Sequence, residues 1–103
     1  MDVTILEHLT ITAAGARTRG GTETNFTYSC NQDVVLTSLT IDFPGYGPFA
    51  DPDAPGHKTA GTTYHSAGWN CGGGQMPTGD HEMEFLGSWI LGTFDITVTV
   101  HIN

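Results

Sequence analysis

The chain has few basic residues, and this shortage excludes several classes of partner. Only three lysines and arginines stand against eleven aspartates and glutamates, which gives a net charge of −8 over 103 residues. Proteins that bind nucleic acids or anionic membrane surfaces need many Lys and Arg side chains to neutralise phosphates. We therefore expect neither nucleic-acid binding nor docking on an anionic membrane. Cations and basic partners remain open.

Long hydrophobic runs and enzyme signatures are also missing. No apolar run approaches the ~18 residues of a membrane-spanning helix, so no membrane insertion is expected. The chain has no GxSxG elbow, no phosphate-binding loop and no GxGxxG motif. The run from His81 to Glu84 begins like a zinc-protease motif but continues with Phe85 in place of the second histidine. The sequence therefore predicts no enzyme.

The apolar content is low, but it alternates with polar residues. Leu, Ile, Val and Phe make up 22 of 103 residues, whereas Thr occurs 16 times and Gly 14 times. Apolar residues occupy every second position over residues 94–102, which is typical of a half-buried strand. No segment keeps an apolar helical period for three turns. The sequence predicts a single domain over residues 1–103: an all-β antiparallel sandwich, immunoglobulin-like or jelly-roll-like, with six to eight short strands and no long helix.

Shorter alternating runs give the positions of the other expected strands. They cover residues 3–13, 26–30, 35–43, 62–69 and 83–91. Glu7 lies on the apolar side of the first run, which predicts a bulge or a break there, and Leu36 lies on the wrong side of the third. Residues 44–61 hold four of the five prolines, so we expect an ordered loop and not a strand. A second, Gly-rich loop is expected over residues 70–80.

Two stretches resemble a known family of extracellular modules. The ending GTFDITVTVHIN is similar to the last strand of bacterial immunoglobulin-like and polycystic-kidney-disease (PKD) type modules. The stretch FTYSC, a turn and TSLTIDF resemble the strands that precede the Trp-Asp-Phe-Gly-Asp-Gly turn of the PKD type, although this chain lacks that Trp and the second Asp. The resemblance covers about a third of the chain. It implies a sandwich with an extracellular binding or adhesion role, and it transfers no site residue.

The two cysteines leave two possibilities open. A bridge between Cys30 and Cys71 would close a loop of about 41 residues and stabilise the fold by roughly 3–5 kcal/mol. Such a bridge would place the protein in an oxidising compartment. Alternatively, the two thiols are separate, with Cys30 serving as a small buried hydrophobe.

Two groups of acidic residues form a candidate calcium site. Asp80, Glu82 and Glu84 share one face of an expected strand, whereas Asp51 and Asp53 flank a proline in the Pro-rich loop. Calcium takes six to eight oxygen ligands, and three bases are too few to neutralise both groups. Calcium is therefore the leading candidate cofactor, and a solvated acidic face is the alternative.

A softer metal site is a further alternative. His81 and Met83 share a strand face, and Met76 and Cys71 lie shortly upstream. Imidazole together with thioether sulfur suits copper. The simpler interpretation is that Met83 is a core residue, because it lies on the same face of its expected strand as Phe85.

Aromatic residues in the two expected loops predict a ligand-binding surface. Large rings on ordered loops cover the apolar C–H face of a sugar, while neighbouring amides and carboxylates bind its hydroxyls. The predicted contacts are Trp69, Tyr46 and Phe49, with Asn70, Asp51 and Asp53 as polar partners. The alternative is that these rings fold back and cap the sandwich.

Together these features predict a non-catalytic, lectin-like or adhesive binding module that recognises a glycan or a surface protein through its Pro-rich and Gly-rich loops. We expect it outside the cell or at the cell surface, although the lack of a signal peptide in the given chain leaves a cytosolic location open. One alternative is a homo-oligomeric structural protein of a fibre, capsid or coat. Another is an acidic inhibitor or immunity protein for a basic partner.

Overall fold

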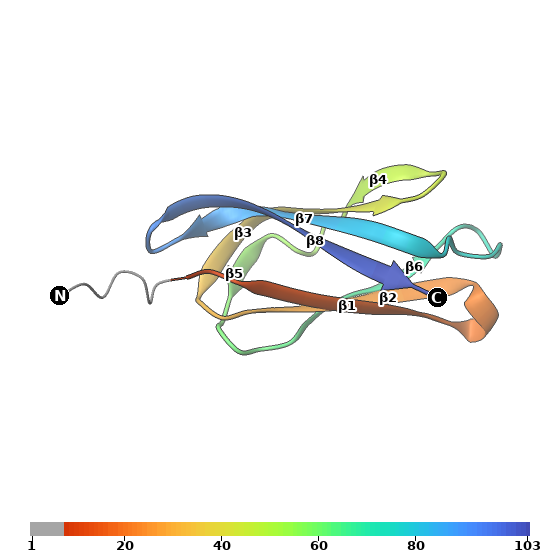
Figure 1. Cartoon of the computed structure of the whole chain (residues 1–103), viewed down its shortest axis with the longest axis horizontal. Coiled ribbons are helices and arrows are strands. Elements are labelled where there is room, and N and C mark those ends of the chain that lie inside the picture. The colour runs from red at the N-terminus through yellow and green to blue at the C-terminus, as the bar shows by residue number, and fades with distance from the viewer. Residues whose placement is uncertain (1–7) are drawn as a thin grey trace.

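Two antiparallel sheets pack face to face in the computed structural model, which describes residues 8–103 (Figure 1). The first sheet has the order β1-β2-β6, with β1 at Ile11–Thr18, β2 at Glu23–Cys30 and β6 at Tyr64–Asn70. The second has the order β4-β3-β7-β8, with β4 at Gly47–Ala50, β3 at Val34–Phe43, β7 at Gly79–Trp89 and β8 at Gly92–Ile102; β5 (Gly56–Lys58) also pairs with β3. A single 3₁₀ turn, η2 (Arg19–Gly21), joins β1 to β2. The predicted all-β sandwich is therefore confirmed, with eight strands in the described part of the chain.

Alternate residues of the strands meet between the sheets and form the core. Phe26 and Tyr28 on β2 face Met83 and Phe85 on β7, and all four are buried. The core is closed along one side where β8 approaches β1. At Gly15 a Cβ atom would lie only 2.8 Å from Phe26, so this position has no room for a side chain. Among residues 8–103, no helix has the length and apolarity needed to cross a bilayer.

A β-bulge in β3 changes which residues face the core. Leu36 pairs with Gly87 and Ser38 pairs with Leu86, so Thr37 is an extra residue in the ladder. Before the bulge Leu36 points inward and Val35 is 48% exposed, while after it the inward residues begin with Leu39. The expectation that Val35 faces inward and Leu36 outward was therefore wrong, because one extra residue reverses the alternation.

The expected loop over residues 44–61 contains two short strands, so that prediction is corrected. β4 pairs with the second half of β3, and β5 pairs with the first half along the same edge. Pro48 is tolerated in β4 because β4 is an edge strand, where a missing N–H can face solvent. The first predicted strand lies partly outside the described residues, as does Glu7, and β1 begins only at Ile11.

The two cysteines are free thiols at opposite ends of the first sheet, so the possible bridge is ruled out in this fold. Cys30 ends β2, whereas Cys71 follows Asn70, which pairs with Glu23 at the start of β2. Seven residues of strand span about 23 Å, but bridged cysteines have Cα atoms about 4.4–6.8 Å apart.

We expect the two thiols to differ in reactivity. Cys30 is buried, and desolvation raises its thiol pKa, whereas Cys71 is only half-buried. Because the thiolate is the reactive form, iodoacetamide should modify Cys71 in the native protein and leave Cys30 unmodified. Mass spectrometry with and without denaturant measures this. Equal labelling of both cysteines in the native state, or a loss of two hydrogens before reduction, would contradict it.

We expect that a substitution at the buried residue Thr24 can make the protein more stable. The Thr24 side chain is fully buried on β2, and its hydroxyl has no hydrogen-bond partner among the described residues. Valine has nearly the same shape without the unsatisfied oxygen, so Thr24→Val should stabilise the protein by about 1 kcal/mol and raise its Tm by roughly 4–8 °C. The control is Thr12→Val on β1, where the side chain is exposed. A lower Tm for Thr24→Val would show that its hydroxyl is bonded.

Candidate functional site

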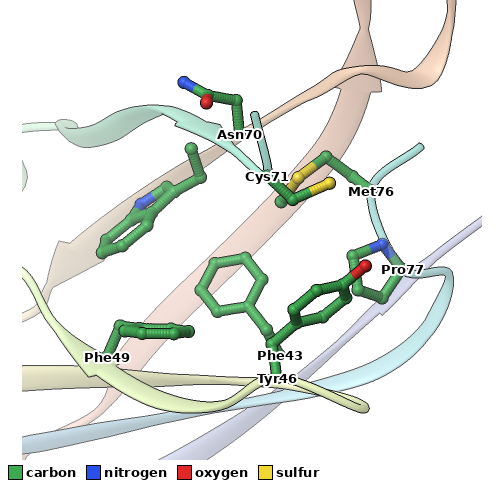
Figure 2. A pocket seen from close by; sticks show the side chains of 8 residues that line it. Phe43, Tyr46, Phe49, Asn70, Cys71, Met76 and Pro77 are labelled. Carbon is green, nitrogen blue, oxygen red and sulfur yellow. The ribbon is translucent and has the colours of Figure 1, made fainter. Parts of the chain in front are cut away.

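The aromatic residues predicted to bind ligand gather at one end of the sandwich. Tyr46 lies in the turn between β3 and β4, Phe49 lies in β4, and Trp69 lies near the end of β6. Figure 1 shows the β4 hairpin and the β6–β7 loop at this end, and the β7–β8 hairpin at the other. The three aromatic residues line a hollow of about 120 Å³, which we call the aromatic hollow (Figure 2). Its lining residues are Phe43, Tyr46, Phe49, Trp69, Asn70, Cys71, Met76 and Pro77.

Phe43 is the buried base of the aromatic hollow. Its ring centroid lies 5.1 Å from that of Trp69 and 5.9 Å from that of Phe49, with interplanar angles of 43° and 58°. Tyr46 and Phe49 are 57% and 46% exposed, so two large rings beside Phe43 are open to solvent. Figure 2 shows the rings of Phe49, Phe43 and Tyr46 one after another across the view, with Pro77 next to Tyr46.

Trp69 is fixed by a chain of hydrogen bonds that ends on a carboxylate. The indole Nε1–H donates to Ser66 Oγ at 2.9 Å, and the Ser66 hydroxyl donates to Asp51 Oδ2 at 2.7 Å. The other oxygen of Asp51 accepts the backbone N–H of Asp53 at 2.9 Å. Both Asp51 oxygens are therefore engaged, so Asp51 positions Trp69.

A second, more polar hollow lies on the other side of Trp69. It measures about 220 Å³, and we call it the polar hollow. Its polar lining includes Asp51, Asp53, His65 and Ser66. All six predicted contact residues thus border one of two hollows that share Trp69 as a common wall.

Most polar side chains around the aromatic hollow already have partners within the protein. The Asn70 amide donates to the Gly68 carbonyl and accepts from the Gly72 N–H, both at 3.2 Å. Its side chain points away from the space in Figure 2. The Cys71 thiol donates to the Gln75 carbonyl at 3.3 Å. Among the polar side chains that line the hollow within residues 8–103, only the Tyr46 hydroxyl has no such partner, so the hollow offers ring faces and apolar surface.

The Gly-rich loop that carries Met76 is tied to the β1–β2 turn. Arg17 Nη1 donates to Gln75 Oε1 at 3.2 Å and to the Met76 carbonyl at 3.3 Å. The Met76 N–H in turn donates to the Gly21 carbonyl at 2.8 Å. This wall of the hollow is therefore held in place by the first sheet.

Several residues of this site were not predicted as ligand contacts from the sequence, and three of them are central to its geometry. Phe43 and Met76 line the aromatic hollow, and Ser66 links Trp69 to Asp51. Phe43 alternates in step with the core residues of its strand, so the sequence predicted a core residue. The position of Met76 depends on the conformation of the Gly-rich loop, which the sequence does not predict. No local pattern marked Ser66 as a partner of either residue.

The acidic residues of β7 lie on the outer face of the second sheet, as predicted. Asp80 accepts a hydrogen bond from His101 at 2.8 Å, with both side chains exposed. Glu82 and Glu84 border a shallow hollow that also includes Asp42. Asp51 and Asp53 belong instead to the loop between β4 and β5. No group of three or more His, Cys, Asp or Glu side chains in residues 8–103 is placed to hold a metal ion, and calcium binding at Asp51, Asp53, Asp80, Glu82 or Glu84 stays a prediction.

His81 and Met83, the alternative soft-metal pair, are both fully buried. His81 Nε2 lies 3.1 Å from the Pro77 carbonyl, and its ring packs against Phe26 and Phe43. Met83 occupies the core position that its parity predicted.

One carboxylate pair on the outer face should make stability depend on pH. A hydrogen bond with Asp95 and the charge of that carboxylate raise the pKa of Glu84. Because the folded-state pKa is raised, ionisation of Glu84 lowers stability as the pH rises through that pKa. Glu84→Gln should therefore raise the Tm at pH 7, and the gain should vanish below about pH 4, where the glutamate is protonated in both states.

Glu82→Gln is the control, because it removes one charge from the same strand without touching Asp95. Melting curves of both variants between pH 3.5 and 8 measure the difference. An equal gain for both at pH 7 would show a general charge effect and contradict the Glu84–Asp95 interaction.

Comparison of the chain with protein-family models, curated proteins and solved structures found no significant match. The features of the chain that bear on its function are therefore the two hollows and the residues that line them.

Proposed function

We propose that this chain is a non-catalytic binding module that recognises a cell-surface ligand, in the first instance a glycan. The observation that carries the proposal is the pair of exposed rings, Tyr46 and Phe49, beside a Trp69 that is fixed between an apolar and a polar hollow. Exposed apolar groups that cluster on a small domain mark interaction sites. The rings would cover the C–H face of a sugar, while Asp53 and His65 would bind its hydroxyls.

Glycan-array binding followed by calorimetry tests the proposal. Tyr46→Ala and Phe49→Ala should abolish binding. We expect a small change in Tm for Tyr46→Ala, which is 57% exposed, and a larger one for Phe49→Ala, whose half-exposed ring packs on Phe43. Trp69→Ala is a poor test, since its indole packs on Phe43 and bonds to Ser66. The control is Ile90→Ala, 81% exposed in the β7–β8 hairpin at the opposite end. Wild-type binding by both ring variants would refute this surface as the site.

A second candidate function, assembly into a fibre, capsid or coat, is favoured by one edge of the second sheet. β8 is eleven residues long, and within residues 8–103 its ladder is formed with β7 alone. Although β1 of the other sheet approaches β8, no second strand is hydrogen-bonded to it in this part of the chain, and such an edge can add a strand from another molecule. Light scattering over a range of concentrations separates the two functions, because assembly requires a stable oligomer and the binding module requires none.

A further inference from the structure

Four aromatic side chains line the aromatic hollow. Phe43 is tilted relative to both Trp69 and Phe49, with ring centroids 5.1 and 5.9 Å away, and Tyr46 lines the same space. A cation within about 6 Å of a ring centroid is attracted by the ring's negative face. These rings pack against one another and form one continuous aromatic wall, so a cation in the hollow can lie against more than one of them.

We propose that the aromatic hollow binds a quaternary ammonium group, the trimethylammonium group of a choline-type ligand. The inference rests on the proposed function, that this end of the molecule is a ligand-binding surface, and it names the chemical group that the hollow holds. Pockets for whole drug-sized ligands measure roughly 300–1,000 Å³. The aromatic hollow, at about 120 Å³, is much smaller, so it suits one small group of a ligand and not a whole ligand.

The hydrogen-bond inventory separates this ligand from an ordinary sugar or amine. A hydroxyl or a primary ammonium that enters the hollow loses its hydrogen bonds to water, and such a loss is costly without new partners. The Asn70 amide and the Cys71 thiol are already bonded within the protein, so the Tyr46 hydroxyl is the one unbonded side-chain group among the described residues that line the hollow. A trimethylammonium group has no N–H to satisfy, so it enters without that loss.

Charge also favours a cation at this place. The chain carries a net charge of −8, and no basic residue lines the hollow. The hydrogen bonds from the Trp69 indole through the Ser66 hydroxyl end on the Asp51 carboxylate. The negative charge of this carboxylate polarises both hydrogen bonds. This leaves the indole, the strongest cation–π partner among the aromatic side chains, richer in electrons.

The first test compares choline with 3,3-dimethyl-1-butanol, which has the same shape but a carbon in place of the charged nitrogen. Titrations of the whole chain are followed by amide chemical shifts and calorimetry at fixed ionic strength. We expect choline to shift resonances of Phe43, Tyr46, Phe49 and Trp69, and to bind at least fivefold more tightly than the neutral isostere. Equal affinities would show a merely apolar hollow, and no shift at 50 mM choline would overturn the proposal outright.

Substitutions that keep bulk but remove the ring provide the second test. Phe49→Leu and Tyr46→Leu should weaken choline binding about two- to fivefold each, whereas Tyr46→Phe, which keeps the ring, should bind like the wild type. Ile90→Ala at the opposite end is the unaffected control, and a melting curve for each variant checks its fold. Unchanged affinity in both leucine variants would overturn the cation–π assignment.

Two further ligands show whether the trimethylammonium group comes from a soluble ligand or from a lipid. Together with the glycan array, they also distinguish the choline proposal from the glycan proposal. Phosphocholine represents a soluble ligand or glycan substituent, and cosedimentation with phosphatidylcholine vesicles, against phosphatidylglycerol vesicles, tests a lipid headgroup. Binding of unsubstituted glycans without any response to choline would overturn this inference and leave the proposed function intact. No response to glycans, choline or phosphocholine would overturn both.

Discussion

Replacing Gly87 with alanine is expected to cost about 3 kcal/mol or more of stability, which lowers the Tm by roughly 12–24 °C. Gly87 lies on β7 opposite the bulge of β3, where the two backbones approach closely. A Cβ atom at Gly87 would lie 2.3 Å from the Val35 carbonyl oxygen and 2.8 Å from the Phe94 ring. The obstacle is mainly backbone, so relief requires the two central strands of the second sheet to separate.

The control for this prediction is Gly74→Ala in the Gly-rich loop. A Cβ atom there would have its nearest neighbour, the Cys71 sulfur, at 3.6 Å, which is an ordinary contact. Thermal and urea unfolding of both variants should show no more than about 0.5 kcal/mol of change for Gly74→Ala. A Gly87→Ala variant as stable as the wild type would mean that the bulge does not bring β3 and β7 this close.

The second large effect is expected at the base of the aromatic hollow. Phe43 is almost fully buried, and its ring packs against those of Phe26, Phe49, Trp69 and His81. Phe43→Ala should lower the free energy of unfolding by about 3–5 kcal/mol, because the substitution leaves a cavity and removes these contacts. That is a large fraction of the roughly 5–15 kcal/mol that stabilises a typical domain.

The same substitution connects stability with binding. Removing the base would open the aromatic hollow into the core, so the variant should bind neither glycan nor choline even below its Tm. Phe43→Leu is the matched variant: it refills most of the volume, so we expect a clearly smaller loss of stability but still weaker choline binding. Chemical denaturation and titration at 10 °C measure the two properties separately. Normal choline binding by Phe43→Ala would contradict the role of this ring.

Local alternation predicted the strands well where the ladder is regular and failed where it is not. β8 follows the predicted alternation from Phe94 to Ile102 because its pairing with β7 has no register shift. In β3 the single bulge after Leu36 reverses the inward face, and its one local sign is that Leu36 breaks the expected alternation. Gly87, which lies opposite the bulge, is about fifty residues away in the chain.

The exposed rings of the candidate site were predictable from the sequence, but its buried base and its geometry were not. Rings among prolines and glycines marked Tyr46, Phe49 and Trp69, and the structure does bring them together. Their arrangement depends on tertiary contacts, above all on the hydrogen bonds through Ser66 that orient Trp69. The sequence left open whether the two cysteines are bridged for the same reason, because the positions of Cys30 and Cys71 are set by the register of β2 with β6.

The division of one sheet edge between β4 and β5 has a consequence for solubility. The two strands run along the same side of β3 but have only four and three residues, with residues 51–55 between them. A strand from another molecule needs a continuous row of unpaired N–H and C=O groups, and Pro48 removes one donor even within β4. The short β4 strand, which carries Phe49 into the aromatic hollow, therefore also interrupts this edge and disfavours aggregation by strand addition.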